Sequence, residues 1–345
     1  MKRWPHLTLG LLVSAFFLWL ALRDLDWNGV AAILGAAHWG YGLLALLIWT
    51  LGLAARAVRW QVLLGGRVPW LPTFHILNIG FVINNTLPFR VGELVRVYLM
   101  GRGEARVSAW AALSTIVAER LLDMLAVVLM LAAVLPTLVI QTAAVTSALL
   151  LGGLAVAGSA MLLVFAHRRQ WAQAILALIL RLLPFLSRLN LAALLDRVLD
   201  GLQPLTTRRG LLGAASWTGI GWLFSTAGSW VLALAFPDLP QTPVMRAALT
   251  LSVVAASFSI IIPFTLASVG PFEAAAVFAL LTAGVPQEVA AAYALVWHTG
   301  VVLTYALWGA LGMLALGLSP GMIRQGAAAL GERVSSQAPE YGSDR

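Results

Sequence analysis

The chain has 345 residues, of which 61% are hydrophobic and only 10% are charged. Soluble domains carry about 25% charged residues, so this composition excludes an ordinary soluble enzyme and indicates an integral membrane protein with several spans. The 22 basic residues outnumber the 14 acidic ones. In a soluble protein this excess would suggest a nucleic-acid partner, but here we expect it to mark the cytoplasmic loops. The absence of cysteine excludes disulfides and thiolate metal sites.

Six apolar segments are long enough to be spanning helices, since about 20 mostly apolar residues cross a bilayer. The first, 7–22, is followed by charged residues rather than by a small-residue cleavage site, so we interpret it as a retained span and not as a signal peptide. The other five are 39–58, 110–138, 142–166, 211–236 and 290–317.

Two further apolar regions, 72–100 and 245–284, are each interrupted near the middle by Pro-Phe and Val-Gly. Cytoplasmic loops are enriched in arginine and lysine. If both regions enter and leave on the same side, nearly all basic residues face the cytoplasm, including Arg56, Arg59 and the seven arginines of 167–209. A complete crossing by the first region would place those seven outside. We therefore predict two re-entrant hairpins in a multi-pass protein of the cytoplasmic (inner) membrane, with both termini inside.

Segment 167–209 is the only long polar stretch within the apolar part of the chain. Its apolar residues recur at helical spacing with arginines between them, which is typical of helices lying on the inner leaflet. We predict one all-α domain over 1–318, with 167–209 as a cytoplasmic amphipathic connection and 319–345 as a polar cytoplasmic tail.

The two interruptions resemble each other. Pro88-Phe89-Arg90-Val91-Gly92-Glu93 matches Pro263-Phe264 followed by Val269-Gly270-Pro271-Phe272-Glu273. Each is followed by an ionisable residue in the next span, Glu119 or His298. Because the first hairpin is entered from inside and the second from outside, we predict an inverted repeat whose broken helices build a midplane site. The expected hinge residues are Pro88, Gly92, Pro263, Gly270 and Pro271.

Three charged residues interrupt the span 110–138. Glu119 lies about 15 Å along this helix, close to mid-membrane, and shares a face with Asp123, beside Arg120. Intramembrane charges cost about 2.5–3.5 kcal/mol each on insertion scales and usually serve function. The alternative is a buried ion-pair network that locks this helix to the first hairpin through Arg90 or Arg96.

Arg90, Glu93 and Arg96 recur at three-residue spacing after the first interruption and therefore share a helix face. The two arginines could hold a phosphate by forked hydrogen bonds, aided by the positive end of the helix dipole. As alternatives, Arg96 could simply extend to the inner surface and Glu93 could be an N-terminal cap. Asn84 and Asn85 could satisfy the broken backbone or bind a ligand.

The second interruption offers fewer polar groups. Glu273 follows Gly270-Pro271 as a cap carboxylate would, and it is equally a candidate proton carrier or cation-facing group. Ser268 could donate to a lipid headgroup. His298 could relay protons near neutral pH, although a lone membrane histidine often makes only a hydrogen bond between helices.

No Gly-rich phosphate loop, metal-spaced cluster or nucleophile elbow occurs, so we expect no cofactor, no metal and no catalytic residue. One weak enzymatic signal is the acidic pair Asp24 and Asp26 in the first external loop. Membrane glycosyltransferases that use lipid-phosphate sugar donors carry such pairs.

The motif residues at 84–96, the Glu119-Arg120-x-x-Asp123 pattern and the stretch 263–273 resemble the lysylphosphatidylglycerol synthase transmembrane region family over about 5–318. The resemblance implies an α-helical fold with re-entrant helices and movement of a lipid between leaflets. The aminoacyl-transferase domain of the full-length synthase is not in this sequence, so we do not expect lysyl transfer.

The leading hypothesis is a flippase for an anionic phospholipid or a lipid-linked substrate. Its partners would be membrane lipids, with a second copy of the chain or a lipid-modifying enzyme as further candidates. The alternatives are a polyprenyl-phosphate-dependent glycosyltransferase or accessory component of glycan or hopanoid lipid synthesis, and a scaffold for a lipid-modifying enzyme.

Overall fold

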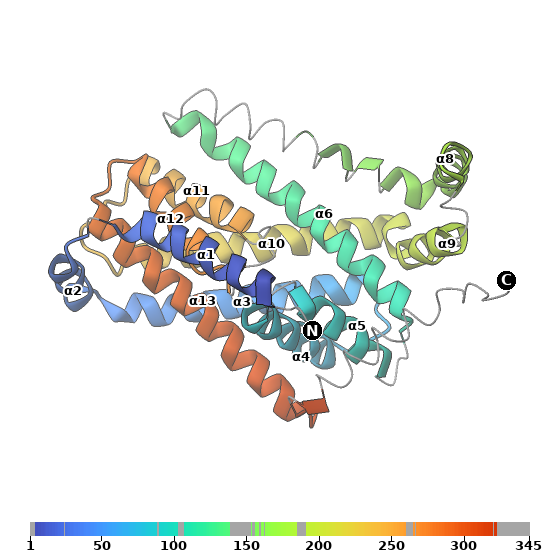
Figure 1. Cartoon of the computed structure of the whole chain (residues 1–345), viewed down its shortest axis with the longest axis horizontal. Helices are drawn as coiled ribbons and strands as arrows, with labels where there is room; N and C mark the ends of the chain where they lie inside the picture. The colour runs from blue at the N-terminus through green and yellow to red at the C-terminus, as the bar shows by residue number, and fades with distance from the viewer. Residues whose placement is uncertain are drawn as a thin grey trace.

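The computed structural model describes residues 4–23, 25–87, 90–102, 107–138, 153, 156–158, 160–161, 163–184, 191–259, 265, 267–319 and 321–322, with side chains from residue 12 onward except that of residue 259. The described chain is helical, without a strand (Figure 1). Its helices are α1 (Trp4–Leu22), α2 (Trp27–Ala36), α3 (Trp39–Leu63), α4 (Trp70–Thr86), α5 (Val91–Arg102), α6 (Ala109–Val134), α8 (Arg169–Leu182), α9 (Leu191–Gly201), α10 (Arg208–Ala233), α11 (Pro243–Ser259), α12 (Pro271–Leu281) and α13 (Gln287–Ala315), with short 3-10 turns η2 (Leu135–Thr137) and η4 (Gln203–Thr206).

The all-α prediction is confirmed, and α1, α3, α6, α10 and α13 coincide with five of the six expected spans. The sixth, 142–166, and the tail lie mostly outside the described residues. Helices α8 and α9 occur within the predicted amphipathic connection. Helix α2 was not predicted, because we assigned no helix between the spans 7–22 and 39–58. Asp26 caps it by accepting the Asn28 N–H at 3.0 Å.

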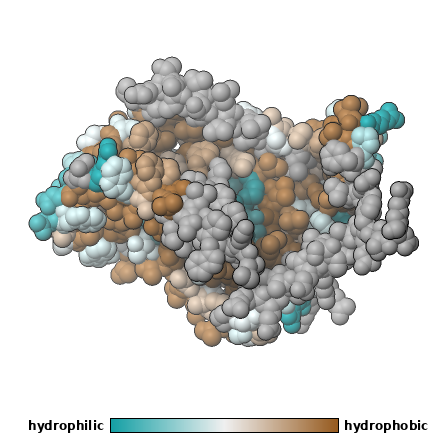
Figure 2. All heavy atoms as spheres, viewed as in Figure 1, coloured by the Kyte–Doolittle hydropathy of each residue, from teal (hydrophilic) through white to brown (hydrophobic). Residues whose placement is uncertain are grey.

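The surface of the helix bundle fits a lipid environment. By length and composition, α3 and α13 are each able to cross a membrane. Large apolar side chains face outward along these helices and along α10, and brown atoms are visible on both sides of the centre in Figure 2. The most exposed of them include Leu43, Leu223, Leu303 and Leu314. The chain is therefore a membrane protein.

Both interrupted regions fold back on themselves. Helices α4 and α5 pack so closely that a Cβ added to Gly92 would lie 2.0 Å from the Gly80 carbonyl oxygen. Helices α11 and α12 also contact each other, with the Ser252 hydroxyl 3.4 Å from the Ala276 carbonyl oxygen. Each region thus forms a helical hairpin. Entry and exit on one side of the bilayer stays a prediction.

Helices α3 and α10 form the antiparallel centre of the fold. Trp49 lies against Gly228, Gly52 against Gly221 and Val62 against Gly213, so the residue number falls on one helix as it rises on the other. Lipid provides no hydrophobic force between helices, and glycines allow the close approach that dispersion contacts need.

The contacts on either side of this pair repeat with the two halves exchanged. In one half of the contacts, α4 and α2 pack on α13, and α3 contacts α4. In the other half, α11 and α9 pack on α6, and α10 contacts α11. The five helices α2 to α6 therefore correspond, in chain order, to the five helices α9 to α13. A two-fold rotation that exchanges the antiparallel helices α3 and α10 has its axis perpendicular to them, which is the geometry of an inverted repeat.

Candidate functional site

A buried ion pair joins α5 to α6 beyond the first break, which we define as 87–90. The two terminal nitrogens of Arg96 lie 2.9 and 3.1 Å from the carboxylate oxygens of Glu119, and both side chains are 1% exposed. The Arg96 guanidinium also lies 4.0 Å from the ring centre of Trp60. Arg96 therefore does not extend to the inner surface, and its charge is compensated inside the protein.

A second pair ties α3 and α10 to α6. Arg59 donates to the two oxygens of Asp123 at 2.5 and 3.3 Å, and the indole N–H of Trp222 donates to Asp123 at 3.0 Å. Arg59 also lies 3.9 Å from Glu119. Our placement of Arg59 at a cytoplasmic loop was wrong: α3 continues to Leu63 and Arg59 is 2% exposed, because carboxylates of α6 compensate its charge.

A looser and more accessible group lies at the tip of the first hairpin. Arg90 and Arg120 approach the same Glu93 oxygen at 3.6 and 3.4 Å, and the three side chains are 32%, 31% and 22% exposed. Neither contact has hydrogen-bond geometry, since this oxygen and the Arg120 Nε lack hydrogen-bond partners. Arg90 also adopts a left-handed φ of 54°, which is uncommon for a residue other than glycine. This group is the part of the cluster that a ligand could rearrange.

The two asparagines before the break both contact backbone. The Asn84 side-chain oxygen accepts the Gly92 N–H at 2.8 Å, and the Asn85 amide donates to the Phe81 carbonyl at 2.9 Å. Asn84 therefore satisfies backbone across the break, Asn85 contacts only its own helix, and a ligand-binding role for either residue stays a prediction. Gly92 is the second residue of α5, where no larger residue fits, whereas Pro88 lies outside the described residues.

A second polar group lies at the N-terminal end of α12 and contacts α13. Glu273 accepts the Gly270 N–H at 2.7 Å, as a cap would, and its other oxygen lies 2.5 Å from His298 Nδ1 on α13. His298 Nε2 lies 2.9 Å from the Ala267 carbonyl oxygen, and the Phe272 ring stacks on the imidazole at 4.2 Å. Glu273 and His298 are 3% and 6% exposed.

The backbone before α12 is unusual. Gly270 has a φ of 93°, Ser268 has a φ of 60°, and Pro271 is the first residue of α12. The Ser268 carbonyl accepts the Phe272 N–H at 3.0 Å. The predicted hinge at Pro263 lies outside the described residues. The hinge glycine is also crowded, since a Cβ on Gly270 would lie 2.2 Å from the Ser14 carbonyl oxygen of α1.

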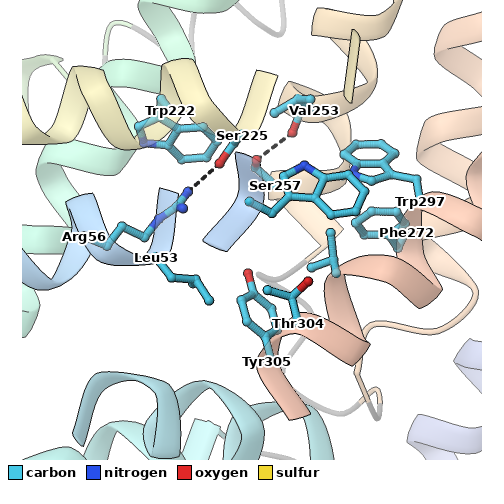
Figure 3. Close-up of a pocket in the computed structure, with 13 residues that line it drawn as sticks. Leu53, Arg56, Trp222, Ser225, Val253, Ser257, Phe272, Trp297, Thr304 and Tyr305 are labelled. Carbon is cyan, nitrogen blue, oxygen red and sulfur yellow. Dashed lines mark hydrogen bonds between the residues drawn. The ribbon is translucent and has the colours of Figure 1, made fainter. Parts of the chain in front are cut away.

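A cavity of about 120 Å³ lies between α3, α10, α11, α12 and α13 (Figure 3). It is bordered by aromatic rings, small hydroxyls and one cation. Its lining residues are Trp49, Leu53, Arg56, Trp222, Ser225, Val253, Ala256, Ser257, Phe272, Trp297, Val301, Thr304 and Tyr305. Trp222 connects it to the ion pair of Arg59, and Phe272 connects it to His298.

Arg56 carries the only charge among the residues that line the cavity. It donates to the Ser225 hydroxyl at 2.9 Å and lies 5.6 Å from the Trp222 ring centre, and it has no ion pair within the described residues. Arg56 lies within the predicted span 39–58, and we had counted it only as a charge on the cytoplasmic side, not as part of a cavity. The sequence did contain a signal for a buried site here, because Arg56 lies within an apolar run and is followed three residues later by Arg59.

The charges around the first break and the cavity do not balance. In the part of the chain that the structure describes, five arginines face three carboxylates here. They are Arg56, Arg59, Arg90, Arg96 and Arg120 against Glu93, Glu119 and Asp123. The charges of Asp123, Arg59 and Arg120 all act on Arg56. The site therefore has a surplus of two positive charges in apolar surroundings, which suits an anionic ligand.

A comparison with models of protein families finds a match over most of the chain. A family model described as the lysylphosphatidylglycerol synthase TM region matches residues 7–309. No curated protein matches the chain significantly.

Proposed function

Because the chain belongs to the lysylphosphatidylglycerol synthase transmembrane region family, we propose that it flips an anionic phospholipid or a lipid-linked substrate between the leaflets of the cytoplasmic membrane. In this proposal the chain is a transporter and not an enzyme, and both termini lie in the cytoplasm. The family supports a role that involves membrane lipids. The surplus of positive charge at the site favours an anionic headgroup.

The observation that carries the proposal is Arg56 beside the central cavity. An arginine at the centre of a spanning helix costs about 2.5–3.5 kcal/mol on insertion scales. The charge of Arg56 is stabilised by a neutral hydroxyl and an indole ring, whereas Arg59 and Arg96 each form an ion pair with a carboxylate. A phosphate in the cavity would supply the missing negative charge through forked hydrogen bonds, and the aromatic lining would accept the start of the acyl chains.

The tip of the first hairpin gives a route to that position. Arg90 and Arg120 hold one oxygen of Glu93 loosely and are about a third exposed. A phosphate has more oxygens than this single contact offers, so it can replace Glu93 between the two arginines. We assign the phosphate to Arg90, Arg120 and then Arg56. Arg96 and Arg59, which are nearly fully buried in ion pairs, then have a structural role and do not contact the phosphate.

The test uses the full chain in liposomes with a fluorescent phosphatidylglycerol and an external quencher. We expect Arg56→Gln and Arg120→Gln each to slow flipping by about tenfold or more, the equivalent of about 1.4 kcal/mol. Arg246→Gln is the matched control, because Arg246 is an exposed arginine at the start of α11. Flipping at the wild-type rate by both site variants would overturn the assignment. Equal flipping of phosphatidylcholine would overturn the preference for anions.

The glycosyltransferase alternative gains no support from the described contacts. Asp26 caps α2, which explains this acid without chemistry, and Asp24 lies outside the described residues. Product formation from a polyprenyl-phosphate sugar that is lost in Asp24→Ala, with Arg56→Gln fully active, would favour that alternative.

A further inference from the structure

The hydrogen bonds around His298 require more protons than a neutral histidine and an ionised glutamate supply. The Ala267 carbonyl can only accept, so Nε2, at 2.9 Å from it, carries a hydrogen. In the neutral ring Nδ1 then has a lone pair. That lone pair would face a Glu273 oxygen at 2.5 Å, and two acceptors at this distance repel each other. A further proton must therefore lie between Nδ1 and the carboxyl group.

We propose that Glu273 and His298 form a proton-binding site whose occupancy controls the conformation of residues 267–270, the segment that leads into α12. Its link to lipid movement depends on the flippase function proposed above, whereas the proton site itself does not. The bound form is a neutral carboxylic acid that donates to Nδ1, or equally an imidazolium that donates to the carboxylate. Both forms carry the same number of protons.

Release of this proton breaks one of the two contacts of the ring. One O–H or N–H bond is lost, the proton leaves to water, and the electron pair stays on the oxygen or on Nδ1. If the hydrogen on Nε2 remains, the ring repels Glu273. If it moves to Nδ1, Glu273 regains a donor, but Nε2 then presents a lone pair to the Ala267 carbonyl. One side of the site must move in either case.

The backbone next to this site is strained, so it is the side expected to move. Ala267 and Ser268 have φ values of 51° and 60°, and non-glycine residues avoid this region. Ala267 is held by His298, and Gly270 is held by Glu273. Loss of either contact removes a restraint on the strained segment. Gly270 also touches Ser14, so the change reaches α1.

Few other charged groups face the pair. The described side chains of α1 are uncharged from residue 12 to Leu22, and on α11 the only titratable residue is Arg246 in the first turn. On α13, Glu288 lies about three turns before His298, and the Tyr293 hydroxyl is bonded to Ser229. The nearest cation on α3 is Arg56, across the cavity that Phe272 lines. The proton thus sits in an apolar pocket beside the proposed lipid path.

The proton site can be tested without any lipid movement. Infrared spectra of the carboxyl group and ¹⁵N NMR spectra of labelled histidine would be recorded from about pH 5 to about pH 9 on the full chain in liposomes. We expect a protonated-carboxyl or doubly protonated histidine signal that disappears as the pH rises and is missing in Glu273→Gln. A signal that does not change over this range would overturn the proposal, because the proton would then be a fixed part of the fold.

A second experiment tests the coupling. Glu273→Gln imitates the proton-bound state, since its amide can accept from Gly270 and donate to Nδ1. We expect the flipping rate of the wild type to change by up to about tenfold per pH unit, the limit for one bound proton, and that of Glu273→Gln to stay constant. The control is Tyr293→Phe, which removes a fully buried hydrogen bond from the same helix without removing a proton carrier.

The outcomes separate the two proposals. A titrating signal with no lipid movement in any variant would reject the flippase and keep the proton site. Lipid movement with the same pH dependence in the wild type and in Glu273→Gln would reject the coupling and keep the flippase.

Discussion

Gly52 of α3 faces Gly221 of α10 where the two halves of the chain cross. A Cβ on Gly52 would lie 3.6 Å from the Gly221 carbonyl oxygen, and a Cβ on Gly221 would lie 3.9 Å from the Gly52 carbonyl oxygen. This reciprocity marks the position of the internal two-fold axis. Arg56 and Ser225 each lie four residues further on and bond to each other, so equivalent positions carry a cation in one half and a hydroxyl in the other. The fold is symmetric, but the site at its centre is not.

The predicted topology can be tested directly, because the chain contains no cysteine. Single cysteines at Arg67 and Arg102, which flank the first hairpin, should react with a membrane-impermeant maleimide only from the cytoplasmic side. Cysteines at Asp238 and Glu288, which flank the second hairpin, should react only from outside. Labelling of Arg67→Cys and Arg102→Cys from opposite sides would show that α4 and α5 cross the membrane completely.

Gly92→Ala should destabilise the first hairpin. The added Cβ would lie 2.0 Å from the Gly80 carbonyl oxygen and 2.6 Å from the Asn84 side-chain oxygen, so the two helices would have to separate. We expect a loss of at least about 1–3 kcal/mol, measured as a lower thermal unfolding midpoint in detergent. Gly219→Ala on α10 is the control, since nothing lies within 4 Å of the added atom. Equal midpoints for the two variants would contradict the close packing.

The pair Arg96 and Glu119 should act as a lock and not as a ligand site. Glu119→Gln leaves a buried guanidinium without its partner, and we expect a loss of about 3–5 kcal/mol in stability. The double variant Arg96→Met with Glu119→Leu removes both charges and should recover most of this stability. We expect it to flip lipid at close to the wild-type rate. A stable but inactive double variant would instead give the pair a direct role.

Asn84 and Asn85 offer a matched comparison, because they are adjacent and chemically identical. Asn84→Ala leaves the Gly92 N–H without its acceptor at the start of α5, which should cost about 1–3 kcal/mol. Asn85→Ala removes only a donor to a carbonyl within its own helix and should cost less than about 1 kcal/mol. Chemical unfolding monitored by tryptophan fluorescence would measure the difference. A larger effect at Asn85 would contradict the cap at Asn84.

Hydropathy and helix breakers were enough to predict the long helices and the two interrupted regions, although they missed α2. They failed where a charge is compensated by a distant residue. Arg59 pairs with Asp123, 64 residues away, and no local pattern predicts that partner, so we ended the span at residue 58 and placed Arg59 in the loop after it. The same limit left the partner of Glu119 open between Arg90 and Arg96, and the structure shows Arg96. The cavity could not be predicted, since its lining comes from five helices.

The exchange of contacts between the halves has a consequence for biosynthesis. Helix α4 rests on α13, where Gly309 and Gly312 bring the backbones together, and α11 rests on α6. The first half of the chain therefore lacks the surface it needs until the last long helix has left the ribosome. Until then, the arginines of α5 and α6 lie in a helix bundle that is not yet complete. A chain truncated before α13 should expose the surface of α4 that normally packs on α13. We expect membrane proteases to degrade such a fragment.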